Sequence, residues 1–396
     1  MDLRFTPDET AWIAKVRAFA QAQVGPYAAT WDEAEHVPRS HVQKLADFGL
    51  FGLVVPQEYG GHGRTPLEAL LAIEVVAEHC GISGRLVVDH NFGPTGLIRH
   101  YGSEAQRRHW LPRIARGEVL TSICITEPEH GSDANRLETR LDPDGRGGYR
   151  LNGHKRWITG AGERELYVVF ARFGDTPGSD GIGCVLVPAD SPGVENGPRE
   201  PTLGLRGIRE AELIFRDVPV SPDQILVPAG PGSFRALMRA YNGQRVGAAM
   251  VATGIGVAAL KAALAYAQQR HQFGRPIADF QAIQFRLADM AMQLDAARYL
   301  CYRAIQSGDP PERYAAGVAK TFAAETAIAV TNSALQVFGG NGYSRHYPIE
   351  RLLRDARMFT LGGGTVEIQR LGIARELVRA GYSPLEPWLE PASSSA

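Results

Sequence analysis

Hydrophobic residues recur every three or four positions through the first part of the chain. The segments 8–24 and 65–80 both show this spacing, and a glycine-rich turn at 60–63 precedes the second one. Such a period places the apolar side chains on one face of a helix. We therefore predict an N-terminal α-helical domain over residues 1–119.

From about residue 121 the pattern changes to short runs rich in β-branched and aromatic residues. Turn sequences such as DPDGRGG and GDTPGSDG separate the runs, which are typical of strands. The predicted strands are TSICIT (121–126), YRLNGHKRWIT (149–159), ELYVVFARF (165–173), IGCVLVP (182–188) and AELIFRDVPV (211–220). They predict a middle β domain over residues 120–228.

Helical spacing returns after Pro228. Five apolar residues between positions 283 and 301 fall on one helical face, and the segment 321–338 runs to a glycine stop at Gly339. The five are Ile283, Leu287, Met290, Leu294 and Cys301. We predict a C-terminal α-helical domain over residues 229–396.

Composition and charge exclude several classes of protein. The 396 residues are 44% hydrophobic and 21% charged, and 42 Lys and Arg balance 43 Asp and Glu. A formal net charge of -1 gives no basic face for nucleic acid. The first residues lack the apolar core of a signal peptide, and the uncharged run 246–260 is too short to span a bilayer. We expect no membrane association and a cytoplasmic location.

The four cysteines, Cys80, Cys124, Cys184 and Cys301, are far apart in the sequence. Their spacing favours reduced core thiols over disulfides or a zinc site, so no metal is expected.

Five motifs occur in order along the chain: CITEPEHGSDA (124–134), NGHKRWITGAG (152–162), RHQFGRPIADFQA (270–282), QVFGGNGY (336–343) and GTVEIQR (364–370). Together they resemble the acyl-CoA dehydrogenase family of flavoproteins over essentially the whole chain. The resemblance implies an α+β fold with an N-terminal α-helical domain, a middle β-barrel or sandwich and a C-terminal four-helix bundle. It also implies FAD as cofactor and an acyl thioester as substrate.

The first two motifs contain residues suited to a flavin ring. In the first, a strand opens into a Gly/Ser/Asp turn that presents the hydroxyls of Thr126 and Ser132, and a flavin ring needs such donors at its polar edge. Taken alone, Trp157 would also fit a core aromatic at a strand end. The resemblance implies that Ile125, Thr126, Trp157 and Thr159 contact the ring and that Ser132 contacts flavin phosphate or the thioester.

The next two motifs suit the phosphates of the cofactor. Arg270 can bind a pyrophosphate with two hydrogen bonds, although a lone Arg at a helix end is also typical of a solvated cap. Gly339 and Gly340 let the backbone approach the ADP part closely. The resemblance implies that neighbouring subunits of a homotetramer share each FAD. The further residues that it assigns to the cofactor are Phe273, Gln281, Gln336, Thr365 and Glu367.

Both positions where the family carries its catalytic Glu hold another residue. The Glu that removes the substrate's α-proton stands just before the GTxEIQR motif, where this chain has Gly363 beside Gly364. A subset of the family has its Glu just before Arg245, where this chain has Gln244. Glycine takes no proton, and an amide orients a substrate but is no base near neutrality. The pocket is thus predicted to have room and no base at these positions.

Asn242 and Arg245 resemble the family's contact with the thioester carrier, with Asn where Asp is common. The sequence is compatible with either coenzyme A or an acyl-carrier protein as the carrier of the thioester.

Asp89 lies among apolar residues in a segment that matches the border of the family's acyl pocket. A carboxylate there is costly to bury unless it is paired or used. We predict a relocated base whose pKa is raised by apolar surroundings, as in the branch that acts on alicyclic acyl-CoA. A turn-forming role for Asp89 is the alternative, and His90 is a second candidate base.

The predicted function is an FAD-dependent dehydrogenase of an acyl thioester that passes electrons to an electron-transfer flavoprotein. A flavin monooxygenase of the same fold, or a homologue that binds a thioester without oxidising it, stays open. Relatives of the monooxygenase kind usually lose the TEP and GSD elements, which this chain keeps. That favours the dehydrogenase.

Overall fold

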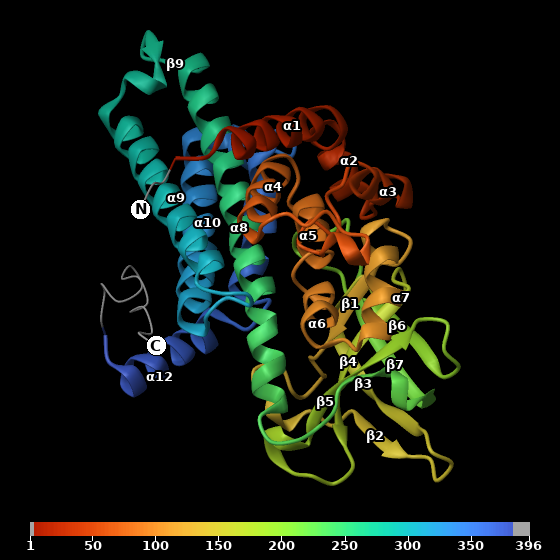
Figure 1. The fold of residues 1–396 in the computed structure, drawn as a ribbon. Helices are drawn as coiled ribbons and strands as arrows, with labels where there is room; N and C mark the ends of the chain where they lie inside the picture. Colours follow the sequence, from red (N-terminus) through yellow and green to blue (C-terminus); the bar gives the residue numbers. More distant parts are fainter. Residues whose placement is uncertain (1–3, 383–396) are drawn as a thin grey trace.

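The computed structural model describes residues 4–382, and its helices and strands follow the predicted order of α, β and α regions (Figure 1). The N-terminal helices are α1 (Pro7–Gln23), α2 (Ala28–Ala34), α3 (Arg39–Asp47), α4 (Pro66–His79), α5 (Gly81–Asp89), α6 (Pro94–Tyr101) and α7 (Glu104–Ala115). The predicted helices α1 and α4 both begin with a Pro and a capping box, formed by Thr6 with Glu9 and by Thr65 with Glu68. These local signals explain why the sequence prediction of both helices is confirmed.

The middle region forms an eight-stranded sheet in which β6, β7, β3, β2, β4, β5 and β8 follow one another and β1 pairs with β4. Its strands are β1 (Thr121–Cys124), β2 (Arg140–Pro143), β3 (Tyr149–Thr159), β4 (Leu166–Phe173), β5 (Ile182–Pro188), β6 (Val194–Arg199), β7 (Glu210–Val220) and β8 (Ile225–Val227). All five predicted strands are confirmed. The pairing of β3 with β7 places Thr159 opposite Glu210, and this pair becomes important at the site.

Long helices form the C-terminal region: α8 (Ser233–Gln269), α9 (Gln281–Gln306), α10 (Arg313–Phe338), α11 (Ile349–Arg357) and α12 (Val366–Ala380). Between α8 and α9 lies a small hairpin of β9 (His271–Gln272) and β10 (Arg275–Pro276). The predicted face of α9 is confirmed, since Met290, Leu294 and Cys301 are buried. The predicted glycine stop is also confirmed, because Gly339 ends α10 with a φ of 58°.

Helix α8 extends on both sides of the uncharged run 246–260 that the sequence shows. By length and hydropathy it could cross a membrane, but 67% of its most apolar window is buried inside the protein, as in a core helix. Small residues let it pack closely, since a Cβ at Gly254 would lie 2.6 Å from the Glu74 carbonyl oxygen of α4. Helix α8 therefore forms the common core of the N-terminal and C-terminal helices.

All four cysteines are buried and free, which confirms the prediction of reduced core thiols.

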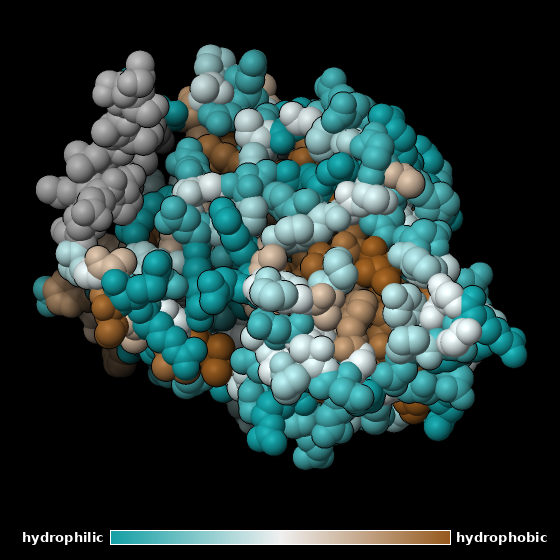
Figure 2. Space-filling view, turned by 60° about the horizontal axis from the view of Figure 1, so that its bottom comes forward, coloured by the Kyte–Doolittle hydropathy of each residue, from teal (hydrophilic) through white to brown (hydrophobic). Residues whose placement is uncertain are grey.

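On the surface, Figure 2 shows apolar residues gathered in a recessed area that hydrophilic residues border. Recessed apolar surface of this kind is typical of a ligand or subunit contact.

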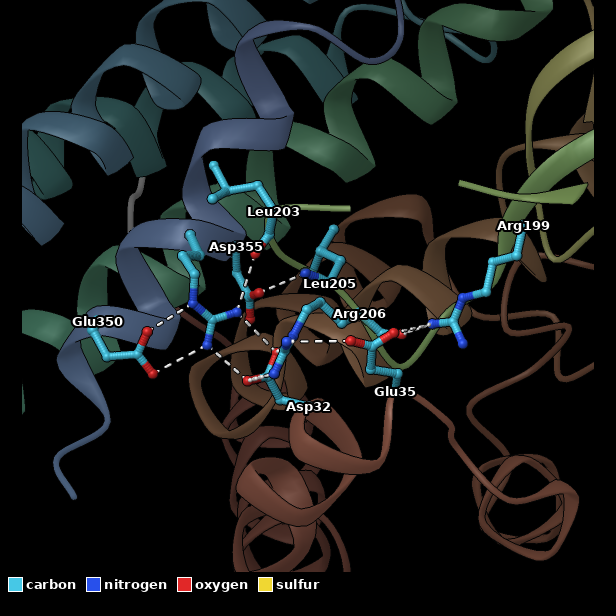
Figure 3. Close-up of polar contacts among 9 residues, drawn as sticks. Asp32, Glu35, Arg199, Leu203, Leu205, Arg206, Glu350 and Asp355 are labelled. Atoms are coloured by element: carbon cyan, nitrogen blue, oxygen red, sulfur yellow. Dashed lines mark hydrogen bonds and ion pairs between the residues drawn. The ribbon is translucent and has the colours of Figure 1, made fainter. Parts of the chain in front are cut away.

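A network of ion pairs ties the loop before β7 to both helical regions (Figure 3). Asp32 of α2 accepts hydrogen bonds from Arg206 of the loop and from Arg354 of α11. Although burial opposes it, these bonds hold the pKa of Asp32 below its usual value. The next residue of α11, Asp355, accepts a bond of 2.6 Å from the Leu205 backbone N–H. The network thus fixes the segment that leads into β7 and Glu210.

Candidate active site

The glycine loop of residues 362–364 connects η8 (Met358–Thr360) to α12. Gly363 and Gly364 have φ values of 74° and 86°, in the left-handed region that favours glycine. Arg245 Nε donates to the Gly363 carbonyl oxygen at 3.1 Å, and Lys320 Nζ donates to that of Gly364 at 2.7 Å. A Cβ at Gly363 would meet only the Arg245 Cγ, at 4.0 Å. The loop is therefore held in place, yet it leaves open space at Gly363, where the resemblance predicts that the family's base is missing.

Arg245 is oriented by a buried amide on the same helix. Its Nη1 donates to Asn242 Oδ1 at 2.6 Å, while Asn242 Nδ2 donates to the Pro311 carbonyl oxygen at 2.9 Å. Burial lowers the pKa of Arg245 to about 10. Because both ends of the Asn242 amide are used within the chain, Asn242 positions Arg245 in this structure, and its contact with a thioester carrier stays a prediction.

Asp89 does not lie isolated among apolar side chains, so that part of the sequence interpretation is wrong. Its Oδ1 accepts hydrogen bonds from Arg85 Nε at 3.2 Å and from Gln244 Nε2 at 2.8 Å. The missed signal was local, because Arg85 precedes Asp89 by four residues and shares its helix face. A role as base stays a prediction for Asp89, which the structure shows as the partner of a guanidinium and an amide.

His90 is fully buried, and its contacts are those of a packed core residue. Its Nδ1 lies 2.7 Å from the Leu86 carbonyl oxygen, and its ring stacks on Phe51 with 4.0 Å between the ring centroids. Burial lowers the pKa of His90 to about 4, so that the imidazole is neutral. These contacts favour a packing role over the second candidate base.

Arg85 also reaches the sheet, through two residues that are partners across β3 and β7. Its Nη2 donates to Thr159 Oγ1 at 3.4 Å, and Thr159 Oγ1 donates to Glu210 Oε1 at 2.8 Å. Burial opposes the charge on Arg85, yet the carboxylates of Asp89 and Glu210 raise the pKa of its guanidinium. Arg85 and Glu210 are site residues that the sequence interpretation missed.

A second guanidinium lies in the turn between β3 and β4. Arg164 is 6% exposed and packs against Gly160, where a Cβ would overlap it. Within residues 4–382 its Nε and Nη2 make no hydrogen bond. Burial lowers the pKa of Arg164, while Asp89 acts to raise it. Two guanidinium groups beside one ionised Asp89 leave net positive charge in this part of the site when Glu210 is protonated.

The structure brings together the residues predicted for the flavin ring. Lys155 Nζ donates to the Ile125 carbonyl oxygen at 3.1 Å, and the Arg156 N–H donates to that of Thr126 at 2.9 Å, so the end of β1 lies beside β3. Trp157 and Thr159 follow on β3, and the Trp157 side chain is 51% exposed, not a core aromatic. Ser132 is exposed in the turn after β1.

The residues predicted for the phosphates lie elsewhere in the chain. Arg270, Phe273 and Gln281 surround the β9–β10 hairpin, at the top of Figure 1, whereas β1, β3 and β7 lie at the lower right. Gln336, Gly339 and Gly340 belong to the same end of the bundle as the hairpin, because Tyr266 near the end of α8 stacks on Phe338 at 4.1 Å. One chain thus does not unite the two halves of the cofactor site, in keeping with the predicted sharing between subunits.

These residues fit FAD. No atom lies within 4 Å of a Cβ built at Gly339 or Gly340, so the backbone there is open to a ligand. Phe273 is 93% exposed and can cover an adenine or flavin ring. Thr365 caps α12 by accepting from the Ile368 N–H at 3.3 Å, and Glu367 is exposed in its first turn.

Three protein-family descriptions match the chain: acyl-CoA dehydrogenase N-terminal domain over residues 6–118, middle domain over 122–218 and C-terminal domain over 233–378. The 3-sulfinopropanoyl-CoA desulfinase of Cupriavidus necator is 43% identical over 93% of this chain and 96% of its own length. The mitochondrial isobutyryl-CoA dehydrogenase of Dictyostelium discoideum is 37% identical over 94% of this chain and 89% of its own length.

Solved structures share the whole fold. Butyryl-CoA dehydrogenase from Megasphaera elsdenii superposes with a TM-score of 0.92 at 32% identity, covering 96% of this chain and 100% of the other. A glutaryl-CoA dehydrogenase in complex with glutaryl-CoA gives a TM-score of 0.92 at 30% identity, covering 96% and 97%. The predicted α+β architecture is confirmed.

Proposed function

Because this chain belongs to the acyl-CoA dehydrogenase family of FAD-dependent oxidoreductases, we propose that it acts on an acyl-CoA whose short acyl group ends in an anion. The reaction proposed is release of the sulfinate group of 3-sulfinopropanoyl-CoA. The observation that carries the proposal is a mostly buried, positively charged Arg85 in a site predicted to lack the usual base.

The missing base argues against ordinary dehydrogenation. Gly363 presents only backbone and open space, and the Gln244 amide is engaged with Asp89. Neither group takes an α-proton near neutral pH, and a positioned general base contributes roughly 10²–10⁴-fold to such a step. A reaction that leaves the α-proton in place fits this site better.

Positive charge at the site argues for an anionic acyl end. A guanidinium presents donors in a planar fork that matches two oxygens of a sulfinate or carboxylate. Arg85 uses its Nε on Asp89, which leaves further N–H groups for a ligand, and both Nε and Nη2 of Arg164 are without a partner among the described residues. The 3-sulfinopropanoyl and glutaryl groups named for two of the relatives both end in such an anion.

The relatives favour the sulfinate over the carboxylate. Four proteins with the desulfinase name are 42–44% identical to this chain, compared with 30% for the glutaryl-CoA dehydrogenase. In the proposed reaction the carbon–sulfur bond breaks, the carbon gains a proton and the sulfur gains a hydroxyl from water. The products are propanoyl-CoA and hydrogensulfite, with no net oxidation of the acyl-CoA.

Each group of the chain then has a defined task. Arg85 and Arg164 hold the anion, and Asp89 and Gln244 hold Arg85 in position. The glycine loop and Arg245 border the space left at the missing base. FAD, held by the ring and phosphate residues described above, would supply redox-active flavin chemistry to the site.

The proposal is tested with the FAD-loaded protein and 3-sulfinopropanoyl-CoA, without any electron acceptor. We expect sulfite and propanoyl-CoA in equal amounts, measured by a colorimetric sulfite assay and mass spectrometry. The competing dehydrogenase function predicts instead anaerobic bleaching of the flavin by butyryl-, isobutyryl- or cyclohexanecarbonyl-CoA, with electrons passing to an electron-transfer flavoprotein. Bleaching without sulfite release would replace the proposed function by that one, and oxygen uptake by the reduced enzyme would favour the monooxygenase.

Replacing Arg270 by Ala is expected to weaken FAD retention by roughly ten- to a hundredfold, because a hydrogen bond to a charged group contributes about 1.5–3 kcal/mol. The measurement is the FAD content per chain after dialysis, followed by titration of the apoprotein with FAD. Arg275→Ala is the matched control, since the Arg275 guanidinium on the same hairpin lies over the Phe280 ring, 4.4 Å from its centroid. Equal loss of FAD in both variants would contradict a phosphate contact of Arg270.

We further propose a homotetramer as the assembly. Large apolar side chains are exposed on the C-terminal helices and loops, among them Phe285, Met292 and Tyr343. Shared FAD sites would also require a neighbouring subunit, since one chain separates the ring and phosphate residues (Figure 1). Light scattering coupled to gel filtration measures the mass, and a monomer that retains FAD would contradict the proposal.

A further inference from the structure

We propose that Glu210 is a catalytic residue that delivers the proton to the acyl carbon, replacing the family base that is missing at residue 363. This inference rests on the proposed function and adds the acid that the reaction needs. Two carboxyl groups meet around Arg85, those of Asp89 and Glu210, and the structure separates their roles.

Position favours Glu210. It is the first residue of β7, half-buried, and its Oε1 accepts a hydrogen bond of 2.8 Å from Thr159, a residue predicted to contact the flavin ring. Thr159 Oγ1 also accepts a hydrogen bond of 3.4 Å from Arg85. The Thr159 hydroxyl therefore connects the Glu210 carboxyl to Arg85, which is proposed to bind the anion. Within residues 4–382 Oε2 makes no hydrogen bond, which leaves it available to carry a proton.

Asp89 differs from Glu210 because it is held in an ion pair. Its Oδ1 accepts from both Arg85 and Gln244, and the contact with Arg85 is an ion pair that needs the ionised form. Protonating Asp89 would weaken the bond that holds the anion-binding guanidinium. Asp89 is therefore a positioning residue for Arg85, while Glu210 can exchange a proton without breaking an ion pair.

Several charged or titratable groups face Glu210. They are Arg85 and Asp89 on α5, Arg164 in the turn after β3, and Tyr241 on α8. Burial is the strongest influence and raises the pKa of Glu210 to about 7, against the opposing effect of Arg85. A carboxyl that is partly protonated near neutral pH can both give and recover a proton within one reaction cycle.

With Glu210 as the acid, the protons and electrons of the desulfination reaction balance. As the carbon–sulfur bond breaks, its electron pair stays on carbon and the Glu210 proton forms the new C–H bond. The sulfur, released at the level of sulfur dioxide, takes a hydroxyl from water to form hydrogensulfite. The remaining proton of that water returns to Glu210, so no oxidant or reductant is consumed.

The protonation state of Glu210 should also affect how tightly the site binds its ligand. Ionised Glu210 adds a carboxylate beside Arg85 and opposes a bound anion, so an acyl group with an anionic end should bind more weakly as the pH rises through about 7. A neutral acyl group should show no such change. This effect does not depend on cleavage of a carbon–sulfur bond.

The experiment compares holoenzyme of the wild type, Glu210→Gln and the control Glu212→Gln. Glu212 lies two residues further along β7 and accepts instead from His154, at 2.9 Å. Binding of succinyl-CoA and propanoyl-CoA is measured from the flavin absorbance between pH 6 and 8.5. We expect the Kd of succinyl-CoA to rise by roughly tenfold in wild type and control, as for a coupling of one pKa unit, and to stay constant in Glu210→Gln.

The second arm measures sulfite release from 3-sulfinopropanoyl-CoA against pH. Glu210→Gln, which preserves the shape and the bond to Thr159, should lose roughly 10²–10⁴-fold in rate, Glu210→Asp should recover part of it, and Glu212→Gln should match wild type. A wild-type rate in Glu210→Gln, or a pH-independent Kd of succinyl-CoA in wild type, would overturn the inference. If the wild type releases no sulfite while the Glu210-dependent binding effect is present, the proposed function fails and Glu210 is supported as the proton-carrying group of the site.

Discussion

Replacement of Arg85 by Gln is expected to lower kcat/KM for sulfite release by roughly 30- to 5,000-fold, because truncating one partner of a desolvated charge pair costs about 2–5 kcal/mol. The substitution removes the guanidinium that is proposed to hold the sulfinate. It also leaves the Asp89 carboxylate buried beside Gln244 without its counter-charge. Two effects on the protein, on ligand affinity and on stability, therefore have to be separated.

The double variant Arg85→Gln with Asp89→Asn separates them. It removes both charges together, so the thermal melting temperature should recover relative to the single variant, since an uncompensated buried charge is no longer present. Sulfite release should stay low, because the anion still lacks its guanidinium. Binding of propanoyl-CoA, which has no anionic end, should be similar in the wild type and the double variant. Recovery of sulfite release in the double variant would show that Arg85 serves only to neutralise Asp89.

The order of domains was predictable from the sequence because local spacing determines most of the elements. Helices α1 and α4 carry their own caps, and β3, β4 and β7 are long runs with a clear alternation or an apolar interior. Strands β2, β6 and β8 were missed. Strand β6 reads Val-Glu-Asn-Gly-Pro-Arg, whose composition indicates a turn, and it is a strand because it pairs with β7 at the edge of the sheet.

The candidate site was predictable only where a motif marks it. Thr126 and Trp157 belong to such motifs, and the structure places them side by side at the ends of β1 and β3. Arg85 and Glu210 carry no motif, and they meet because α5 packs beside the end of the sheet, with Arg85 and Thr159 74 positions apart in the sequence. Contacts that distant in sequence depend on tertiary packing and leave no periodic signal.

The two missed residues change how the missing base is interpreted. From the sequence, Asp89 in an apolar segment was the candidate replacement for the Glu absent at residue 363. In the structure Asp89 forms an ion pair with Arg85, whereas Glu210 makes no ion pair within residues 4–382 and has a pKa raised to about 7 by burial. A site that binds an anion and donates a proton is chemically different from one that removes a proton, and this difference can be tested at the glycine loop itself.

Under the proposed function, replacing Gly363 by Glu is expected to raise the dehydrogenase activity of the protein. The new carboxylate would stand where the family carries its base, and a positioned base contributes roughly 10²–10⁴-fold. The space is available, because the nearest atom to a Cβ there is the Arg245 Cγ at 4.0 Å. The φ of 74° is unfavourable for a side chain and should cost about 1–2 kcal/mol of stability. The measurement is the rate of anaerobic flavin bleaching by butyryl-CoA.

Gly363→Ala and Gly363→Gln are the matched controls. Alanine introduces the same backbone strain without a carboxylate, and glutamine adds the volume without a proton acceptor. Both should lose stability as the Glu variant does and gain no bleaching. The Glu variant should also bind succinyl-CoA more weakly than the Gln variant, because a further negative charge opposes the anionic acyl end. Rapid bleaching of the wild-type flavin by butyryl-CoA would contradict this expectation, since it would require a base for the α-proton elsewhere in the site.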